Sequence, residues 1–206
     1  MRTSGVTGAY PAHARLTRGR LLRTALGAGA AAAGGAALGR LSDGASLAAP
    51  SQATDEKILG VFLTLERAQE AFYRAALRSG RLSGDLHRYA ATVADQEARH
   101  VAFLTERAGG GALPPVRTSF GTAFASPARF RAAAIELEEA TIAAYIGQGA
   151  NLRRATLRAV ATLVSVEARQ AAWIRDLDGT IPAPRAADPA RPPQAVLSDL
   201  RSKGLL

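Results

Sequence analysis

A duplicated residue pattern constrains the fold of this chain more than any other feature. L-E-R-A-Q-E-A-F-Y at residues 65–73 returns as L-E-E-A-T-I-A-A-Y at 137–145, 72 positions later. E-A-R-H-V-A-F-L at 97–104 returns as E-A-R-Q-A-A-W-I at 167–174, 70 positions later. Each copy therefore pairs a Glu-bearing segment with an E-A-R segment. Self-similarity of this kind indicates a duplicated structural unit, here a helical hairpin.

Helix start and stop signals predict four helices, near 54–80, 83–108, 126–148 and 151–178. Their N-caps are expected at Thr54, Ser83, Ser126 (followed by Pro127 at the first helical position) and Asn151. The chain is rich in alanine and only 5% aromatic, a composition that favours helices over strands. It contains no cysteine, which excludes disulfides, zinc–thiolate sites and iron–sulfur clusters.

The positions of four glutamates predict how these helices are arranged. Glu66 and Glu97 lie equally far from the turn between the first two helices, and Glu138 and Glu167 lie equally far from the second turn. Residues equidistant from a turn are level in an antiparallel hairpin, here about 23 Å from it. The connection at 109–125 spans at most about 56–60 Å, enough to return along a helix of about 37 Å. We therefore expect an all-α four-helix bundle of two antiparallel hairpins joined by a long crossover.

The D-Q-E-A-R-H segment at 95–100 carries the clearest chemical motif. Glu97 and His100 are three residues apart, so their side chains leave one face of a helix and can hold one metal ion. They also fall on an apolar stripe that should face the core. Burying an unpaired carboxylate there is costly, which favours a cation partner.

With these motifs in place, the chain resembles the ferritin-like di-metal carboxylate proteins, and more closely the exported ferritin-like family that includes desiccation-related proteins. The resemblance covers about residues 55–178 and rests on four motifs in the same order. It implies a ferritin-like bundle that holds iron or manganese as one or two ions. By this likeness Glu66 and His100 would bind one metal, Glu97 and Glu167 would bridge, and Glu138 would bind the second metal.

Gln170 departs from the family pattern, which has histidine at that place. An amide oxygen is a weaker ligand than imidazole for Fe(II). We therefore expect the half with Glu66, Glu97 and His100 (the His100 half) to bind metal more tightly than the other. The second half comprises Glu138, Glu167 and Gln170 (the Gln170 half). A degenerate site, with polar residues bonded to each other and to water, is the alternative.

Two tyrosines follow the glutamates by seven residues, or two helical turns. Tyr73 lies beyond Glu66 and Tyr145 beyond Glu138 on the same helix faces. Their hydroxyls are expected either to bond the ligand carboxylates or to be satisfied within an aromatic core. The sequence favours neither reading.

The N-terminal 50 residues are interpreted as an export signal or a disordered leader. T-R-G-R-L-L-R at 17–23 precedes an uncharged run at 24–39, which is shorter than the roughly 20 residues of a membrane-spanning helix. S-L-A at 46–48 offers small residues for cleavage. The heptad is similar to a twin-arginine signal, although Gly19 replaces the second arginine, so the Sec route stays open. We expect an exported protein (periplasmic, cell-envelope or extracellular) without a stable membrane span after signal removal.

The remaining chain divides into the bundle at 51–179 and a Pro-rich tail at 180–206, with a short amphipathic piece at 194–202. The tail is expected to pack in extended form or to fray. The net charge of +9 is concentrated in the leader, where six Arg face one Asp. No basic stripe interleaved with aromatics follows, so nucleic acid is not expected as a partner.

Two classes of function follow. In the first, the protein binds iron or manganese and meets a small oxidant or Fe(II), as a ferroxidase, a peroxide-scavenging enzyme or an iron-binding protein. In the second, it is a metal-free or degenerate-site bundle with a structural or stress-protective, desiccation-related role. The oligomeric state is left open.

Overall fold

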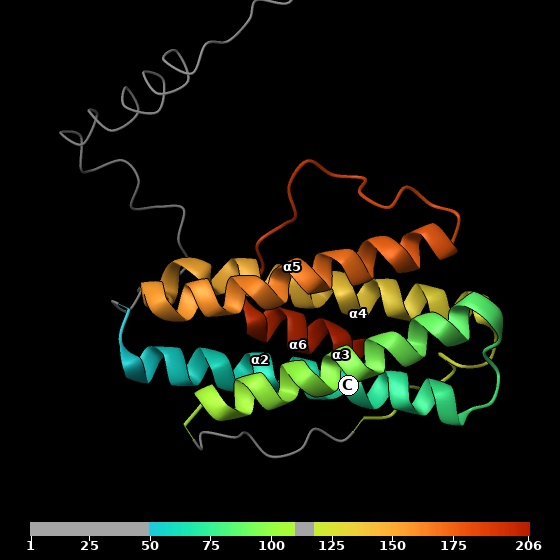
Figure 1. The fold of residues 1–206 in the computed structure, drawn as a ribbon, viewed down its shortest axis with the longest axis horizontal. Helices are drawn as coiled ribbons and strands as arrows, with labels where there is room; N and C mark the ends of the chain where they lie inside the picture. Colours follow the sequence, from blue (N-terminus) through green and yellow to red (C-terminus); the bar gives the residue numbers. More distant parts are fainter. Residues whose placement is uncertain (1–49, 110–117) are drawn as a thin grey trace, which may run out of the picture. The chain divides into compact units, whose positions relative to one another are not determined.

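The computed structural model describes residues 50–109 and 118–206, and within them every regular element is helical. The elements, labelled as in Figure 1, are α2 (Gln52–Arg78), α3 (Gly84–Arg107), α4 (Pro127–Gln148), the short 3₁₀ helix η1 (Gly149–Asn151), α5 (Arg154–Leu177) and α6 (Pro193–Ser202). The expected all-α fold is confirmed. Most of the predicted leader lies outside the described residues, as do residues 110–117 of the predicted crossover.

The helices form two antiparallel hairpins, as the duplicated sequence predicts. α2 packs chiefly on α3, and α4 packs chiefly on α5. The two hairpins meet through contacts of α2 with α4 and of α3 with α5. α3 ends at the opposite end of the bundle from the start of α4 (Figure 1), as expected for two hairpins joined by a long crossover. The turn from α2 to α3 contains Gly80 at φ +65°, in the left-handed region that glycine adopts most readily.

Two of the four predicted N-caps are wrong by a few residues. Ser51, rather than Thr54, caps α2 and accepts a 3.1 Å hydrogen bond from the Thr54 backbone N–H. Asn151 lies in η1, and α5 begins only at Arg154. Ser126 caps α4 as predicted, with Pro127 at the first helical position.

The start of α5 is capped from another helix, which is why a local signal is lacking there. Asp55 of α2 accepts a 3.0 Å hydrogen bond from the Arg153 backbone N–H and a 2.7 Å bond from Arg153 Nε. It also accepts a bond from the Thr156 hydroxyl. Asp55 is 2% exposed. Burial raises the pKa of Asp55, but these hydrogen bonds outweigh that effect and the pKa lies below its ordinary value.

The end of the chain joins the core, whereas residues 181–190 ahead of it are exposed and lack helical or strand structure. The amphipathic piece predicted at 194–202 forms α6, which packs on α4 with Val196 and Leu200 fully buried. Ahead of α6, the Arg191 backbone N–H donates a 2.9 Å hydrogen bond to the Ala143 carbonyl. The backbone there approaches Gly147 so closely that a Cβ atom on Gly147 would lie 2.1 Å from the Arg191 oxygen.

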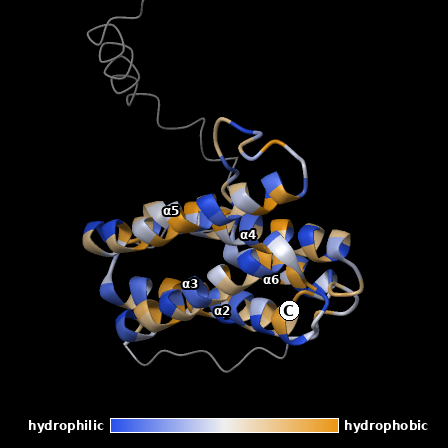
Figure 2. Cartoon of the chain, turned by 45° about the vertical axis from the view of Figure 1, so that its right-hand side comes forward, coloured by the Kyte–Doolittle hydropathy of each residue, from blue (hydrophilic) through white to orange (hydrophobic). Residues whose placement is uncertain are grey.

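The contact with α6 helps to explain the continuous buried segment of α4. Residues 140–145 (A-T-I-A-A-Y) are all buried, because α4 contacts α2, α5 and α6. The other long helices carry polar residues along one side and apolar residues along the other (Figure 2). No helix in the described part of the chain is long and apolar enough to cross a membrane.

Candidate metal centre

Six polar side chains from the four long helices meet in the middle of the bundle. All four carboxylates are fully buried, and His100 and Gln170 are 5% and 2% exposed. Every residue that the sequence analysis proposed as a ligand therefore lies in the core. They are Glu66 on α2, Glu97 and His100 on α3, Glu138 on α4, and Glu167 and Gln170 on α5.

Three carboxylates converge on the imidazole of His100. Its Nδ1 lies 3.1 Å from Glu66 Oε2, 2.9 Å from Glu167 Oε1 and 3.4 Å from Glu97 Oε2. One ring N–H cannot satisfy three acceptors. The Glu97 Oε2 and Glu167 Oε1 atoms are in fact buried without a hydrogen-bond partner. Within the described residues, one ligand atom from each of these four side chains lies within 4.8 Å of the other three.

Buried acceptors without donors are expensive, and a divalent cation between them would satisfy all of them at once. Carboxylate oxygens with a single imidazole are a donor set suited to Fe(II) or Mn(II), and no thiolate is available. The residues Glu66, Glu97, His100 and Glu167 therefore fit one ion.

The environment of Glu138 differs from that of the other carboxylates. Its Oε1 accepts a hydrogen bond from the Tyr73 hydroxyl and a longer one, 3.5 Å, from the Tyr89 hydroxyl. Its Oε2 accepts a 3.1 Å bond from Gln69 Nε2. Both oxygens of Glu138 are thus already satisfied by donors of the protein.

Gln69 is the residue of the cluster that the sequence analysis missed. It is fully buried on α2 and bonds two carboxylates, Glu138 and Glu167, at 3.1 Å each. Its carbonyl oxygen accepts a 2.8 Å bond from the Thr141 hydroxyl. A signal for it was present, because Gln69 is three residues after Glu66 on the same helix face. In addition, Thr141 is its counterpart in the repeat, 72 positions later.

Both predicted tyrosines place their hydroxyls on carboxylates, but each bonds the glutamate of the other hairpin. Tyr73 donates to Glu138, and Tyr145 donates to Glu66. These bonds cross between α2 and α4, so they tie the two hairpins together at the level of the carboxylates. Tyr89, which the sequence analysis did not single out, extends the network through a 3.0 Å contact between its hydroxyl and that of Tyr73.

Gln170 also donates rather than accepts. Its Nε2 bonds Glu97 Oε1 at 2.9 Å and Gln96 Oε1 at 3.0 Å. Its own Oε1 is buried without a partner. The side chain thus sits beside the cluster and stabilises a carboxylate through its amide hydrogens.

Burial and mutual repulsion control protonation in the cluster. Burial, together with the charge of Glu167, raises the pKa of both Glu97 and Glu138 well above the usual range. Burial and the charge of Glu66 likewise raise the pKa of Glu167. Burial also disfavours the charge on Glu66, but hydrogen bonds with His100 reverse this and lower its pKa. Burial disfavours charged His100 as well, yet its close ion-pair contacts with Glu167, Glu66 and Glu97 raise its pKa to about 12. In the absence of a metal ion, bound protons therefore reduce the repulsion between the carboxylates.

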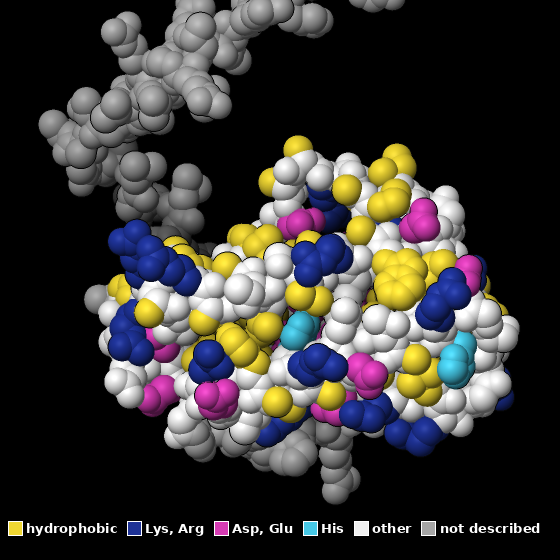
Figure 3. All heavy atoms as spheres, in the orientation of Figure 1, with side chains coloured by type: hydrophobic (Ala, Val, Ile, Leu, Met, Phe, Trp, Pro, Cys, Tyr) yellow, Lys and Arg dark blue, Asp and Glu magenta, His cyan; other side chains and the backbone are white. Residues whose placement is uncertain are grey.

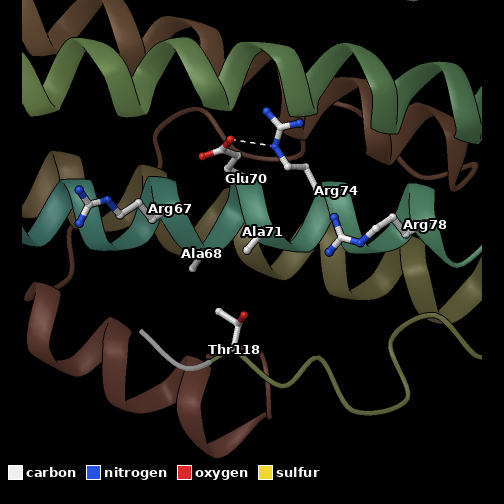
Figure 4. A pocket seen from close by; sticks show the side chains of 7 residues that line it. All are labelled: Arg67, Ala68, Glu70, Ala71, Arg74, Arg78 and Thr118. Atoms are coloured by element: carbon white, nitrogen blue, oxygen red, sulfur yellow. Dashed lines mark hydrogen bonds and ion pairs between the residues drawn. The ribbon is translucent and has the colours of Figure 1, made fainter. Parts of the chain in front are cut away.

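A surface groove of 380 Å³ lies elsewhere on α2 and contains none of these carboxylates. Figure 4 shows Arg67, Arg74 and Arg78 projecting from α2 around it, with Arg74 paired to Glu70 at 2.8 Å. On the face drawn in Figure 3, basic side chains are interspersed with acidic and apolar ones.

The arrangement defines a class of protein: an all-helical bundle with a buried cluster of carboxylates and one imidazole that could hold a metal. Comparison with known families agrees with it. The profile described as ferritin-like domain matches residues 54–180, more than half of the chain. The protein belongs to the ferritin-like domain family. No curated protein matches the sequence.

Proposed function

We propose that this protein binds iron or manganese in the bundle core, through Glu66, Glu97, His100 and Glu167. The observation that carries the proposal is the convergence of three buried carboxylates on one imidazole nitrogen, with two buried oxygens left without donors. A buried group of this composition is stable either with protons or with a cation, and a divalent ion satisfies more of its oxygens.

A bound iron or manganese ion would supply redox chemistry with a small oxidant, as in ferroxidase or peroxide-scavenging activity. The protein's part is to hold the ion and exclude water from it. Glu66 and Glu97 come from the two helices of the first hairpin, and Glu167 from the second, so the helices fix their relative positions. Tyr145 orients Glu66 by donating a hydrogen bond to its Oε1 atom.

The test is the metal content of the purified protein after incubation with Fe(II) under anaerobic conditions or with Mn(II). We expect tight binding in the natural sequence and at least a ~10–100-fold weaker affinity for His100→Ala, since even an indirect partner of a metal ligand contributes that much. His87→Ala is the matched control, because His87 is an exposed imidazole on the same helix. Equal metal content in the two variants would contradict the proposed ligand set. Mixing the Fe(II) form with dioxygen or with peroxide then distinguishes the two activities.

A metal-free bundle with a structural or stress-protective role, as among desiccation-related proteins, is the second candidate. The observation that favours it is the completeness of the hydrogen bonds around Glu138, which needs no cation. Failure of the protein to bind Fe(II), Mn(II) or Zn(II) would select this candidate.

We also propose that the protein is exported, by a twin-arginine-like or Sec signal within residues 1–50. The support is the order of a basic segment, an uncharged run and S-L-A at 46–48. N-terminal sequencing of the mature protein should then begin near Ala49. Full-length protein found only in the cytoplasm would contradict this proposal.

A further inference from the structure

We infer that the amide group of Gln69 occupies the place of a second metal ion, so that each chain holds a single ion. This inference rests on the proposed metal function. It concerns the Gln170 half, where the family resemblance implies a second ion bound by Glu138, Glu167 and the residue at position 170.

Gln69 lies where a second ion would have to bind. Its Nε2 atom lies 3.1 Å from Glu138 Oε2 and 3.1 Å from Glu167 Oε2, between the two carboxylates that would bind the second ion. A metal ion bonds carboxylate oxygens at about 2.0–2.2 Å, so it has to lie between the same two oxygens. An amide nitrogen has no lone pair to offer a metal. Gln69 therefore excludes the ion instead of binding it.

The orientation of this amide is fixed by its other end. The Thr141 hydroxyl donates a 2.8 Å hydrogen bond to Gln69 Oε1. Turning the amide over would remove both N–H bonds to Glu138 and Glu167 and the bond from the Thr141 hydroxyl. The observed orientation instead gives each of the two N–H groups its own carboxylate acceptor.

Carboxylate oxygens that have a hydrogen-bond donor and those that lack one lie on different sides of the cluster. Both oxygens of Glu138 have protein donors. Glu167 is split: its Oε2 receives the Gln69 amide, whereas its Oε1 lies without a hydrogen bond beside His100. Glu97 is split in the same way, because its Oε1 receives the Gln170 amide and its Oε2 lies without a hydrogen bond beside His100. Among the side chains that the structure describes, both buried carboxylate oxygens that lack a donor thus lie beside His100, and the third buried oxygen without a partner is the amide Oε1 of Gln170.

Two buried amides therefore do in the Gln170 half what a divalent ion does in a di-metal site, which is to offer positive charge to the carboxylates. Replacing one amide should not be sufficient to admit an ion. In particular, Gln170→His supplies the missing imidazole but leaves Gln69 in place. If residue 170 alone excluded the second ion, Gln170→His would be sufficient to admit it.

Mn(II) titration with electron paramagnetic resonance and elemental analysis tests the inference. The natural sequence and Gln170→His should each bind one Mn(II) per chain, with the spectrum of an isolated ion. Gln69→Glu combined with Gln170→His should bind two, with the spectrum of a coupled pair, because the donor becomes an acceptor of the same size. The matched control combines Gln170→His with Gln194→Glu, which adds the same charge at an exposed position on α6, and should bind one.

The outcomes separate the inference from the proposed function. Two ions in the natural sequence or in Gln170→His overturn the inference and leave the metal function standing. No Mn(II), Fe(II) or Zn(II) in any variant overturns both. If Gln69→Glu does not fold, Gln69→Ala with Gln170→His removes the amide without adding charge. A folded form of either double variant that still binds one ion overturns the role of Gln69.

Discussion

Asp55 links the start of α5 to α2, and its removal should destabilise the bundle without touching the metal centre. In Asp55→Ala the backbone N–H of Arg153 and the hydroxyl of Thr156 lose a buried, charged acceptor. Each hydrogen bond to a charged group contributes about 1.5–3 kcal/mol. The Arg153 side chain is half exposed, so solvent screens its contribution and adds little. We expect a loss of about 3 kcal/mol in the free energy of unfolding, which is the lower end of the sum of these two bonds.

The measurement is urea unfolding of the chelator-treated protein, followed by circular dichroism. On a chain of this size, about 3 kcal/mol corresponds to a fall in Tm of about 6–12 °C. Asp85→Ala is the matched control, because Asp85 also lies in the first turn of a helix but pairs with Arg88 at an exposed site. We expect less than about 0.5 kcal/mol for it. Similar losses in the two variants would refute the reasoning that Asp55 caps α5.

The pH dependence gives a second check on Asp55. Its folded-state pKa is lowered, so the stabilisation is fully present above the unfolded pKa of about 3.9. It is lost as the pH falls through the lower folded-state pKa. The difference in stability between the natural sequence and Asp55→Ala should therefore be constant near neutral pH and shrink only below about pH 4.

Three further predictions concern other contacts. Gly147→Ala should loosen the C-terminal segment, because the new Cβ would lie 2.1 Å from a backbone oxygen, and limited proteolysis should then cut that segment faster. Gly149→Ala, whose Cβ would meet only a side chain at 3.6 Å, should behave like the natural protein. Tyr145→Phe should lower the free energy of unfolding by about 1–3 kcal/mol, since Glu66 loses a buried donor; an unchanged urea midpoint would contradict this. Mn(II) binding should release protons and weaken as the pH falls, because the ion displaces the proton that His100 holds with a pKa of about 12. Calorimetry in buffers of different ionisation enthalpy counts the released protons, and a count of zero would contradict the prediction.

Residues that act through local patterns could be predicted from the sequence. The repeat and the E-A-R motifs placed Glu66, Glu97, Glu138 and Glu167 at one level, because helical rise and turn position alone determine which residues are opposite each other. Ser126 with Pro127 marked the start of α4, because a cap bonds a backbone N–H only three residues away. These interactions depend on short sequence separations, which the sequence displays directly.

Residues whose partners are distant in sequence could not be predicted. Asp55 caps a helix 98 residues away, so the sequence around Asn151 gave a misleading local signal. The burial of α6 depends on the apolar side of α4 that remains after α2 and α5 have packed, and nothing in the Pro-rich segment before α6 reveals it. The largely apolar run at 140–145 and the amphipathic piece at 194–202 were signs of this contact, but neither identifies its partner.

The sequence by itself determined the helical hairpins, their pairing and the identity of the carboxylates, since periodicity and spacing act along one helix or across one turn. The tertiary structure decided how the donors are distributed among those carboxylates. Gln69 and Glu138 are 69 residues apart and meet only because α2 packs on α4. A hydrogen bond depends on the distance and direction between two atoms to within a few tenths of an ångström, and a pattern of residue types specifies neither.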